Sequence, residues 1–150
     1  MGIGELALIG VVVFFFLVVV PMLALTWVRR LKANAEAEVR ALGNPRLLDA
    51  VAQTAGVYSR GATQSRGNGC LAAFDDDLVF LQWVPHRTLR IPRSTITGVG
   101  RINAFLGKWK GRPLLEVRWD GPEGSDSAAW WVADLDAWER ELGNNQVTNR

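Results

Sequence analysis

Apolar side chains fill the amino-terminal part of the chain without interruption. After Glu5 the next ionisable residue is Arg29, and none of the residues 6–28 carries a charge. A helix over these 23 residues reaches about 34 Å, which is enough to cross a hydrocarbon core of about 30 Å. Such a run is too long to be the buried core helix of a 150-residue globule. The pattern therefore predicts a transmembrane helix over residues 1–28, with residues 6–28 in the lipid bilayer.

The charged residues at the two ends of this segment differ. Glu5 is the only ionisable side chain before it, whereas Arg29, Arg30 and Lys32 follow it closely. Because basic flanks stay in the cytoplasm, we expect an outward amino terminus and a cytoplasmic carboxyl-terminal part, in a single-pass protein of the plasma membrane. Trp27 lies where an aromatic side chain would anchor the helix at the membrane interface.

A cleaved signal peptide is the alternative to a membrane anchor. Ala33 and Ala35 have the spacing of small residues at a cleavage site. However, a signal peptide begins with basic residues, has a shorter apolar region and carries no group of cations just before the cut. We therefore favour the anchor. Pro21 lies within the span, where proline can kink a helix.

Beyond the apolar segment the pattern is first helical and then that of strands. Residues 29–44 are rich in Ala, Glu, Arg and Leu, which predicts a juxtamembrane helical stalk surrounded by solvent, rather than a coiled-coil partner helix. Residues 45–143 alternate short apolar runs with turn residues, which predicts one domain. Within it, residues 46–53 fit either a strand or a short helix. Residues 144–150 form a polar tail.

Several segments of the domain have the period of two that is typical of half-buried strands. The expected strands are 69–74, 78–84, 86–91, 114–119 and 127–132, with turns at 75–77 and 120–124. Leu89 and Ile91 share the inward face of one strand. In the strand 114–119, Leu115 should point into the core with Val117 and Trp119, while Leu114 points outward.

Tryptophans mark the last strand and the helix that follows it. Trp130 and Trp131 are adjacent, so they face opposite sides of a strand and only one can point inward; the outward one is a candidate partner surface. Leu135, Trp138 and Leu142 form an apolar stripe at helical spacing. This helix can plug the open end of a bent sheet and place Trp138 in the core.

This succession of strands closed by a helix with a buried tryptophan resembles the pleckstrin-homology (PH) superfold. More narrowly, the chain resembles the membrane-anchored PH-like (GRAM-type) domain proteins of bacteria. The similarity covers about half of the chain, in residues 66–99, 105–119 and 126–142. It implies an α+β fold in which a transmembrane helix precedes a PH-like antiparallel β-sandwich or barrel capped by a carboxyl-terminal helix. It also implies a recognition domain that binds lipid headgroups or protein segments.

Composition limits the chemistry of the part outside the apolar segment. Residues 29–150 hold all 17 Lys and Arg against 14 acids, which gives about +3 and does not indicate nucleic acid as a partner. Cys70 is the single cysteine, so no internal disulfide can form, which suits a reducing cytoplasm. One cysteine and one histidine do not suffice for a structural zinc site.

No group of residues converges on catalysis or on a metal. His86 has no partner at catalytic spacing and reads as an exposed strand histidine. Asp75–Asp77 fall on a tight turn, where consecutive carboxylates point in different directions, so a solvated turn is expected there. The serines lie in no nucleophile elbow. We therefore expect no enzymatic activity, no metal and no cofactor.

The strongest candidate for function is a basic stretch. Residues 85–118 contain eight cations and only one acid, Glu116, which gives about +7. The candidate ligand-binding residues are Arg101, Lys108, Trp109, Lys110 and Arg112. Cations attract anionic headgroups, and indole favours the membrane interface.

We therefore expect recognition of anionic phospholipid headgroups or of an acidic segment at the inner membrane face. The basic loop also fits a solvated hairpin whose cations keep a sheet edge soluble. An alternative function is a membrane-tethered scaffold module that binds another membrane-associated protein without lipid specificity.

Overall fold

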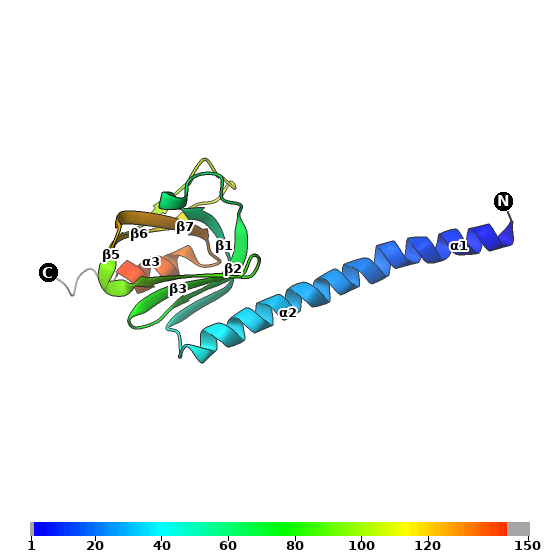
Figure 1. Cartoon of the computed structure of the whole chain (residues 1–150), viewed down its shortest axis with the longest axis horizontal. Coiled ribbons are helices and arrows are strands. Elements are labelled where there is room, and N and C mark those ends of the chain that lie inside the picture. The colour runs from blue at the N-terminus through cyan, green and yellow to red at the C-terminus, as the bar shows by residue number, and fades with distance from the viewer. Residues whose placement is uncertain (1, 144–150) are drawn as a thin grey trace.

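A long helix leads into a seven-stranded antiparallel sheet in the computed structural model, which describes residues 2–143 (Figure 1). The helix consists of α1 (Ile3–Phe14), a π-helical turn η1 (Phe15–Val19) and α2 (Val20–Ala41). Over its 39 residues it is, within the described part of the chain, the one helix long and apolar enough to cross a membrane. The polar tail expected at 144–150 lies outside the described residues.

The π-helical turn lies directly before Pro21. Proline has no N–H for the carbonyl four residues earlier, here that of Leu17, and its ring crowds that carbonyl. The helix widens at this point, and the N–H of Val20 donates to the carbonyl of Phe15, five residues back. Figure 1 shows that the helix continues beyond this turn. The proline is thus accommodated by a wider turn.

The sheet has the strand order β4-β3-β2-β1-β7-β6-β5. Its strands are β1 (Leu47–Val57), β2 (Gly67–Ala73), β3 (Asp77–Gln82), β4 (Arg87–Pro92), β5 (Ile96–Ile102), β6 (Leu114–Gly121) and β7 (Gly124–Trp131). Short 3₁₀ turns, η2 (Tyr58–Arg60) and η3 (Arg93–Thr95), follow β1 and β4.

The first strand joins the two halves of this sheet. β1 pairs with β2 through residues 47–54 and with β7 through residues 53–57, and its register shifts at 49–52 and at 54–56. Such bulges bend a strand, so the sheet folds into two layers. Residues 46–53, which fitted either a strand or a helix, therefore belong mainly to a strand.

β5 is not among the strands expected from the sequence. This strand contains Gly98 and Gly100, which carry no side chain and so interrupt the alternation on which strand prediction depends. At Gly98 the space is taken by the Arg118 guanidinium of β6, which lies 2.7 Å from where a Cβ would be.

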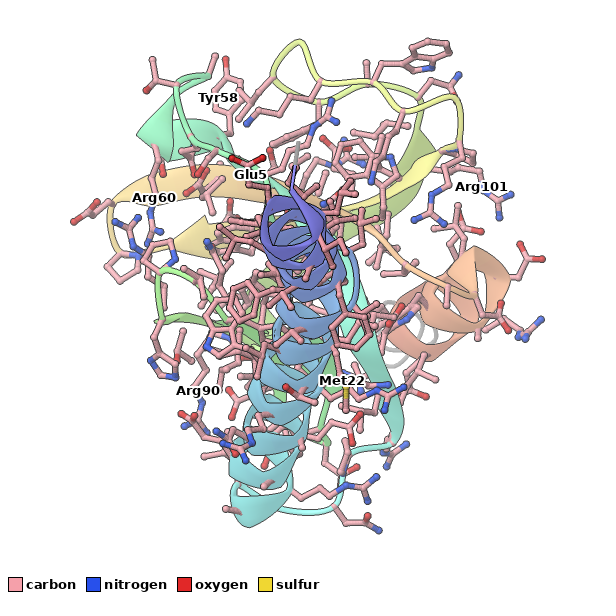
Figure 2. The ribbon with its side chains drawn as sticks, turned by 90° about the vertical axis from the view of Figure 1, so that its right-hand side faces the viewer. Glu5, Met22, Tyr58, Arg60, Arg90 and Arg101 are labelled. Atoms are coloured by element: carbon pink, nitrogen blue, oxygen red, sulfur yellow. The ribbon has the colours of Figure 1, made fainter. Side chains whose placement is uncertain are left out.

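The last helix, α3 (Leu135–Gly143), lies at one open side of the bent sheet, where the two layers meet the solvent (Figure 1 and Figure 2). Trp138 and Leu142 are buried in the main core together with Trp130 and Leu115. This arrangement confirms the predicted apolar stripe of the helix and an α+β architecture with an amino-terminal apolar helix and a carboxyl-terminal one.

Two further clusters cover the outer face of the sheet. Ala35 and Val39 of α2 pack on Cys70 and Leu81, so the expectation of a stalk surrounded by solvent is wrong over this stretch. In the other half, the loop 103–113 covers the outer side of β6 and β7.

The covered outer face explains why two side chains that point outward by alternation are nevertheless buried. Leu114 and Trp131 do lie in the outer cluster, separate from the main core, but both are buried. Trp131 is only 1% exposed, so it is not an open partner surface. Alternation along a strand indicates the side to which a residue points, and it does not indicate what covers that side.

Gly69 of β2 offers a test of the packing between β2 and β3. A Cβ at this position would lie 2.4 Å from the Leu81 carbonyl oxygen and 2.7 Å from the Phe80 ring. We expect Gly69→Ala to lower the free energy of unfolding by about 2 kcal/mol, measured by urea denaturation, because backbone must move to admit the methyl group. Gly100→Ala is the matched control, since a Cβ there meets nothing within 4 Å. Equal stability of the two variants would contradict this packing.

Candidate functional site

Lys108 of the basic loop is directed into the domain. Its ammonium group donates hydrogen bonds to the carbonyl oxygens of Ala55 (2.6 Å) and Gln64 (2.5 Å). Burial lowers the pKa of Lys108, and the charge of Arg66 lowers it further. The ammonium thus fastens the loop to β1 and to the β1–β2 connection.

Arg66 and Lys110 close over the outward tryptophan. The Arg66 guanidinium lies 5.1 Å from the ring centroid of Trp131, and the Lys110 ammonium lies 5.5 Å from it. Arg66 also donates to the carbonyl of Trp109 (3.2 Å), and Lys110 donates to the side chain of Gln53. These cations bind an aromatic face and hold the loop in place.

Trp109 and Arg112 are the loop residues that remain open to solvent. The Trp109 side chain is 65% exposed. Arg112 is exposed and has no ion pair with any residue in the described range 2–143. Of the candidate loop residues, these two are therefore directed outward, while Lys108 and Lys110 have partners within the domain.

Arg101 is directed to α3 and not to the loop residues. It pairs with Glu139 and Asp136 of α3, and these carboxylates raise its pKa. Figure 2, which views the molecule along the long helix, places Arg101 and Arg60 on opposite sides of that helix. Arg101 thus fastens α3 to β5 and lies away from Arg60.

The cations that flank the apolar helix lie on α2. Trp27, Arg29 and Arg30 are exposed, and Lys32 forms an ion pair with Glu36 at 3.7 Å. These residues lie together on one helical segment at the end of the apolar stretch, before the residues that dock on the sheet.

The expected acidic turn and histidine also have neighbours in the structure. Asp75 forms an ion pair with Arg46, and Asp77 forms one with Arg90. His86 lies in the turn before β4, with its Nε2 3.1 Å from the Glu38 carboxylate of α2. Among residues 2–143, no group of three or more His, Cys, Asp or Glu side chains is placed to hold a metal ion.

A cavity of about 260 Å³ opens at one end of the sheet, between the end of β1, the β1–β2 connection and the β3–β4 hairpin. Its apolar lining includes Val57, Phe80 and Leu89. Its polar lining includes the guanidinium-bearing residues Arg60 and Arg87. A ligand in this cavity would therefore meet cations and apolar surface together.

All the charged side chains that line this cavity are positive. No acidic residue lines it, and the segments 50–73 and 78–115 contain no Asp or Glu. Arg60 and Arg87 are exposed, and within the part of the chain that the structure describes neither has an ion pair. The nearby carboxylate of Asp126 is engaged by Ser59, whose N–H donates at 3.0 Å and whose hydroxyl donates at 2.6 Å. The two guanidinium groups are thus available to an anion.

Arg60 and Arg87 are not among the site residues expected from the sequence. They come from separate segments, and the fold of β1 and the β3–β4 hairpin brings them to one cavity. Gln64 shapes the connection between them, since its side chain bonds both the N–H and the carbonyl of Val57. The absence of acids from 50–73 and 78–115 is the sequence signal that could have identified this region.

No family model matches this sequence, and comparison with curated proteins finds no match. The proposed function therefore rests on the geometry and charge of the site.

Proposed function

We propose that the chain is a single-pass membrane protein whose cytoplasmic, PH-like domain binds anionic lipid headgroups at the inner face of the plasma membrane. The observation that carries this proposal is the cavity with two exposed guanidinium groups and no acid in its lining. The PH-like assignment rests on the resemblance of the sequence, and a bent seven-stranded antiparallel sheet with a carboxyl-terminal helix is consistent with it.

Guanidinium groups suit the phosphate of a lipid headgroup. Each can donate two parallel hydrogen bonds to phosphate oxygens. Thr88 also lines the cavity, and its hydroxyl can donate to a headgroup oxygen. The apolar lining near Phe80 can contact carbon atoms of the same lipid. An anionic headgroup therefore matches both kinds of lining.

The stalk supports this proposal because it keeps the domain close to the bilayer. Ala35 docks on the sheet seven residues after Val28, the last residue of the uncharged segment, which is a rise of about 10 Å. The headgroup region extends about 5–7 Å beyond the hydrocarbon core, so the domain begins within a Debye length, about 8 Å, of the lipid charges. At this distance even a weak attraction suffices for the domain to bind lipid headgroups, because the tether gives the domain a high local concentration at the bilayer.

The exposed loop residues add a second contact of the same kind. Trp109 can enter the interfacial layer, and Arg112 can meet the negative surface of the cytoplasmic leaflet. Neither side chain makes a hydrogen bond or ion pair within the described residues 2–143, so lipid binding would break no such contact.

Sedimentation with vesicles tests this function. Residues 29–150 should sediment with anionic phosphatidylserine or phosphatidylglycerol vesicles and not with neutral phosphatidylcholine vesicles. Each of Arg60→Gln and Arg87→Gln should weaken binding about fivefold at low salt, and the double variant about 30-fold, because each cation near an anionic surface contributes about 1 kcal/mol.

Arg101→Gln is the matched control, because it removes a cation that pairs with α3 and lies away from the cavity. It should leave vesicle binding unchanged. Equal sedimentation with anionic and neutral vesicles would overturn the proposal, as would a double variant that binds like the unchanged domain.

A further inference from the structure

We propose that the apolar helix pairs within the bilayer with a transmembrane helix of a different protein, and that this partner carries a hydroxyl or amide donor at mid-bilayer depth. The inference rests on the proposed membrane anchor and is independent of the anion site. It follows from the hydrogen bonds of the helix around Pro21.

The helix has fewer donors than carbonyls at this point. In a regular α-helix, the carbonyls of residues 16–18 would accept from the N–H groups of residues 20–22. The N–H of Val20 donates instead to the carbonyl of Phe15, and Pro21 has no N–H at all. At least one carbonyl among residues 16–18 therefore lacks a backbone donor.

The depth of this carbonyl makes the deficit costly. Residues 16–18 lie at the centre of the uncharged segment 6–28, which corresponds to the middle of the hydrocarbon core. No water is present there to donate, and an unpaired backbone group in lipid is strongly unfavourable. A donor from a neighbouring helix removes this cost, which gives a partner with such a donor an advantage over lipid.

The chain itself has no donor to offer at this depth. Between Leu6 and Leu25, no side chain carries an N–H or O–H group. The nearest hydroxyl is that of Thr26, nine residues or about 13 Å from Leu17, and it already donates to the carbonyl of Leu23 at 2.8 Å.

A second copy in the same orientation would place the same apolar residues beside the carbonyl. The occupant is therefore a helix of another protein, with Ser, Thr, Asn or Gln at its centre.

Photo-crosslinking of the full chain in its native cells tests this inference. A photoreactive residue at Ala24, seven positions after Leu17 and on the same helix face, should form an adduct with one membrane-spanning peptide. Mass spectrometry should find Ser, Thr, Asn or Gln in the middle of that peptide. The same probe at Met22, on the other face, should give a lower yield of this adduct.

Pro21→Leu restores the missing N–H and should lower the adduct yield about 3- to 15-fold, the range expected for one hydrogen bond between membrane helices. Val20→Leu, which leaves the proline in place, is the control and should keep the full yield. The inference is overturned by an adduct between two copies, by a partner segment without a donor, by an absent adduct, or by a yield that Pro21→Leu leaves unchanged. Recovery of the full chain from the soluble fraction would instead overturn the membrane anchor itself.

Discussion

Replacing Val39 by aspartate should release the end of α2 from the sheet. Val39 is fully buried in one cluster with Ala35, Cys70 and Leu81. Burying an unpaired carboxylate costs far more than the packing of one valine contributes. The helix should therefore leave the sheet. The main core should remain folded, because it shares no residue with this cluster.

The reactivity of Cys70 measures this release. Burial, followed by the smaller effects of the Glu36 and Asp49 carboxylates, raises the pKa of the Cys70 thiol from 9.0 to about 11. At pH 8 this lowers the thiolate fraction about 100-fold, and the thiolate is the reactive form. In Val39→Asp the rate of labelling by a maleimide at pH 8 should rise about 100-fold or more.

Val39→Ala serves as the control for this experiment. It keeps the interface apolar and should leave Cys70 protected, with only a small increase in labelling. Rapid labelling of the unchanged folded chain would show that α2 does not cover Cys70. Slow labelling of Val39→Asp with an intact main core would show that the docked helix tolerates the charge.

Removing the guanidinium of Arg93 should destabilise the domain by about 3 kcal/mol. The Arg93 side chain is 4% exposed and donates to the carbonyl of Phe74 (2.9 Å), to the carboxylate of Glu141 (2.7 Å) and to the carbonyl of Glu141 (2.6 Å). Glu141 lies near the end of α3, where helical carbonyls lack partners within the helix. Arg93 therefore holds α3 against the β2–β3 connection.

Arg93→Met keeps much of the side-chain volume but leaves these acceptors unpaired. For a domain of about 100 residues, the expected loss corresponds to a Tm lower by about 12 °C or more. Differential scanning calorimetry of the full chain in lipid nanodiscs measures it, and tryptophan fluorescence should shift to the red as Trp138 becomes exposed. Arg101→Met is the matched control, because Arg101 also pairs with α3 but through exposed contacts, which contribute little. Similar Tm values for the two variants would contradict the role of Arg93.

Local patterns predicted the elements whose surroundings are simple. The alternation of Leu89 and Ile91 and the helical spacing of Trp138 and Leu142 each correspond to an element with one buried face. The uncharged run at the amino terminus likewise corresponds to a long exposed helix. In these cases the buried or lipid-compatible side follows from periodicity alone.

Contacts between distant segments could not be predicted from local periodicity. Nothing near Lys108 in the sequence shows that its ammonium bonds the carbonyl of Ala55, 53 positions away. Arg93 counted as one more cation of the basic stretch, although its side chain is buried against Glu141. Charge along a sequence therefore overstates the charge that a folded surface presents. In this chain Arg60, Arg87 and Arg112 remain exposed without an ion pair in the described region 2–143.

The helix is continuous from Ile3 to Ala41, so it couples the rotation of its apolar part to the rotation of the domain. No hinge separates its apolar part from the turns that dock on the sheet through Ala35 and Val39. Each residue of a helix corresponds to a rotation of about 100°. One residue inserted between Lys32 and Ala35 would thus rotate the domain by about 100° around the helix axis. The arginine-lined cavity would then face a different direction, although every contact inside the cavity would stay the same.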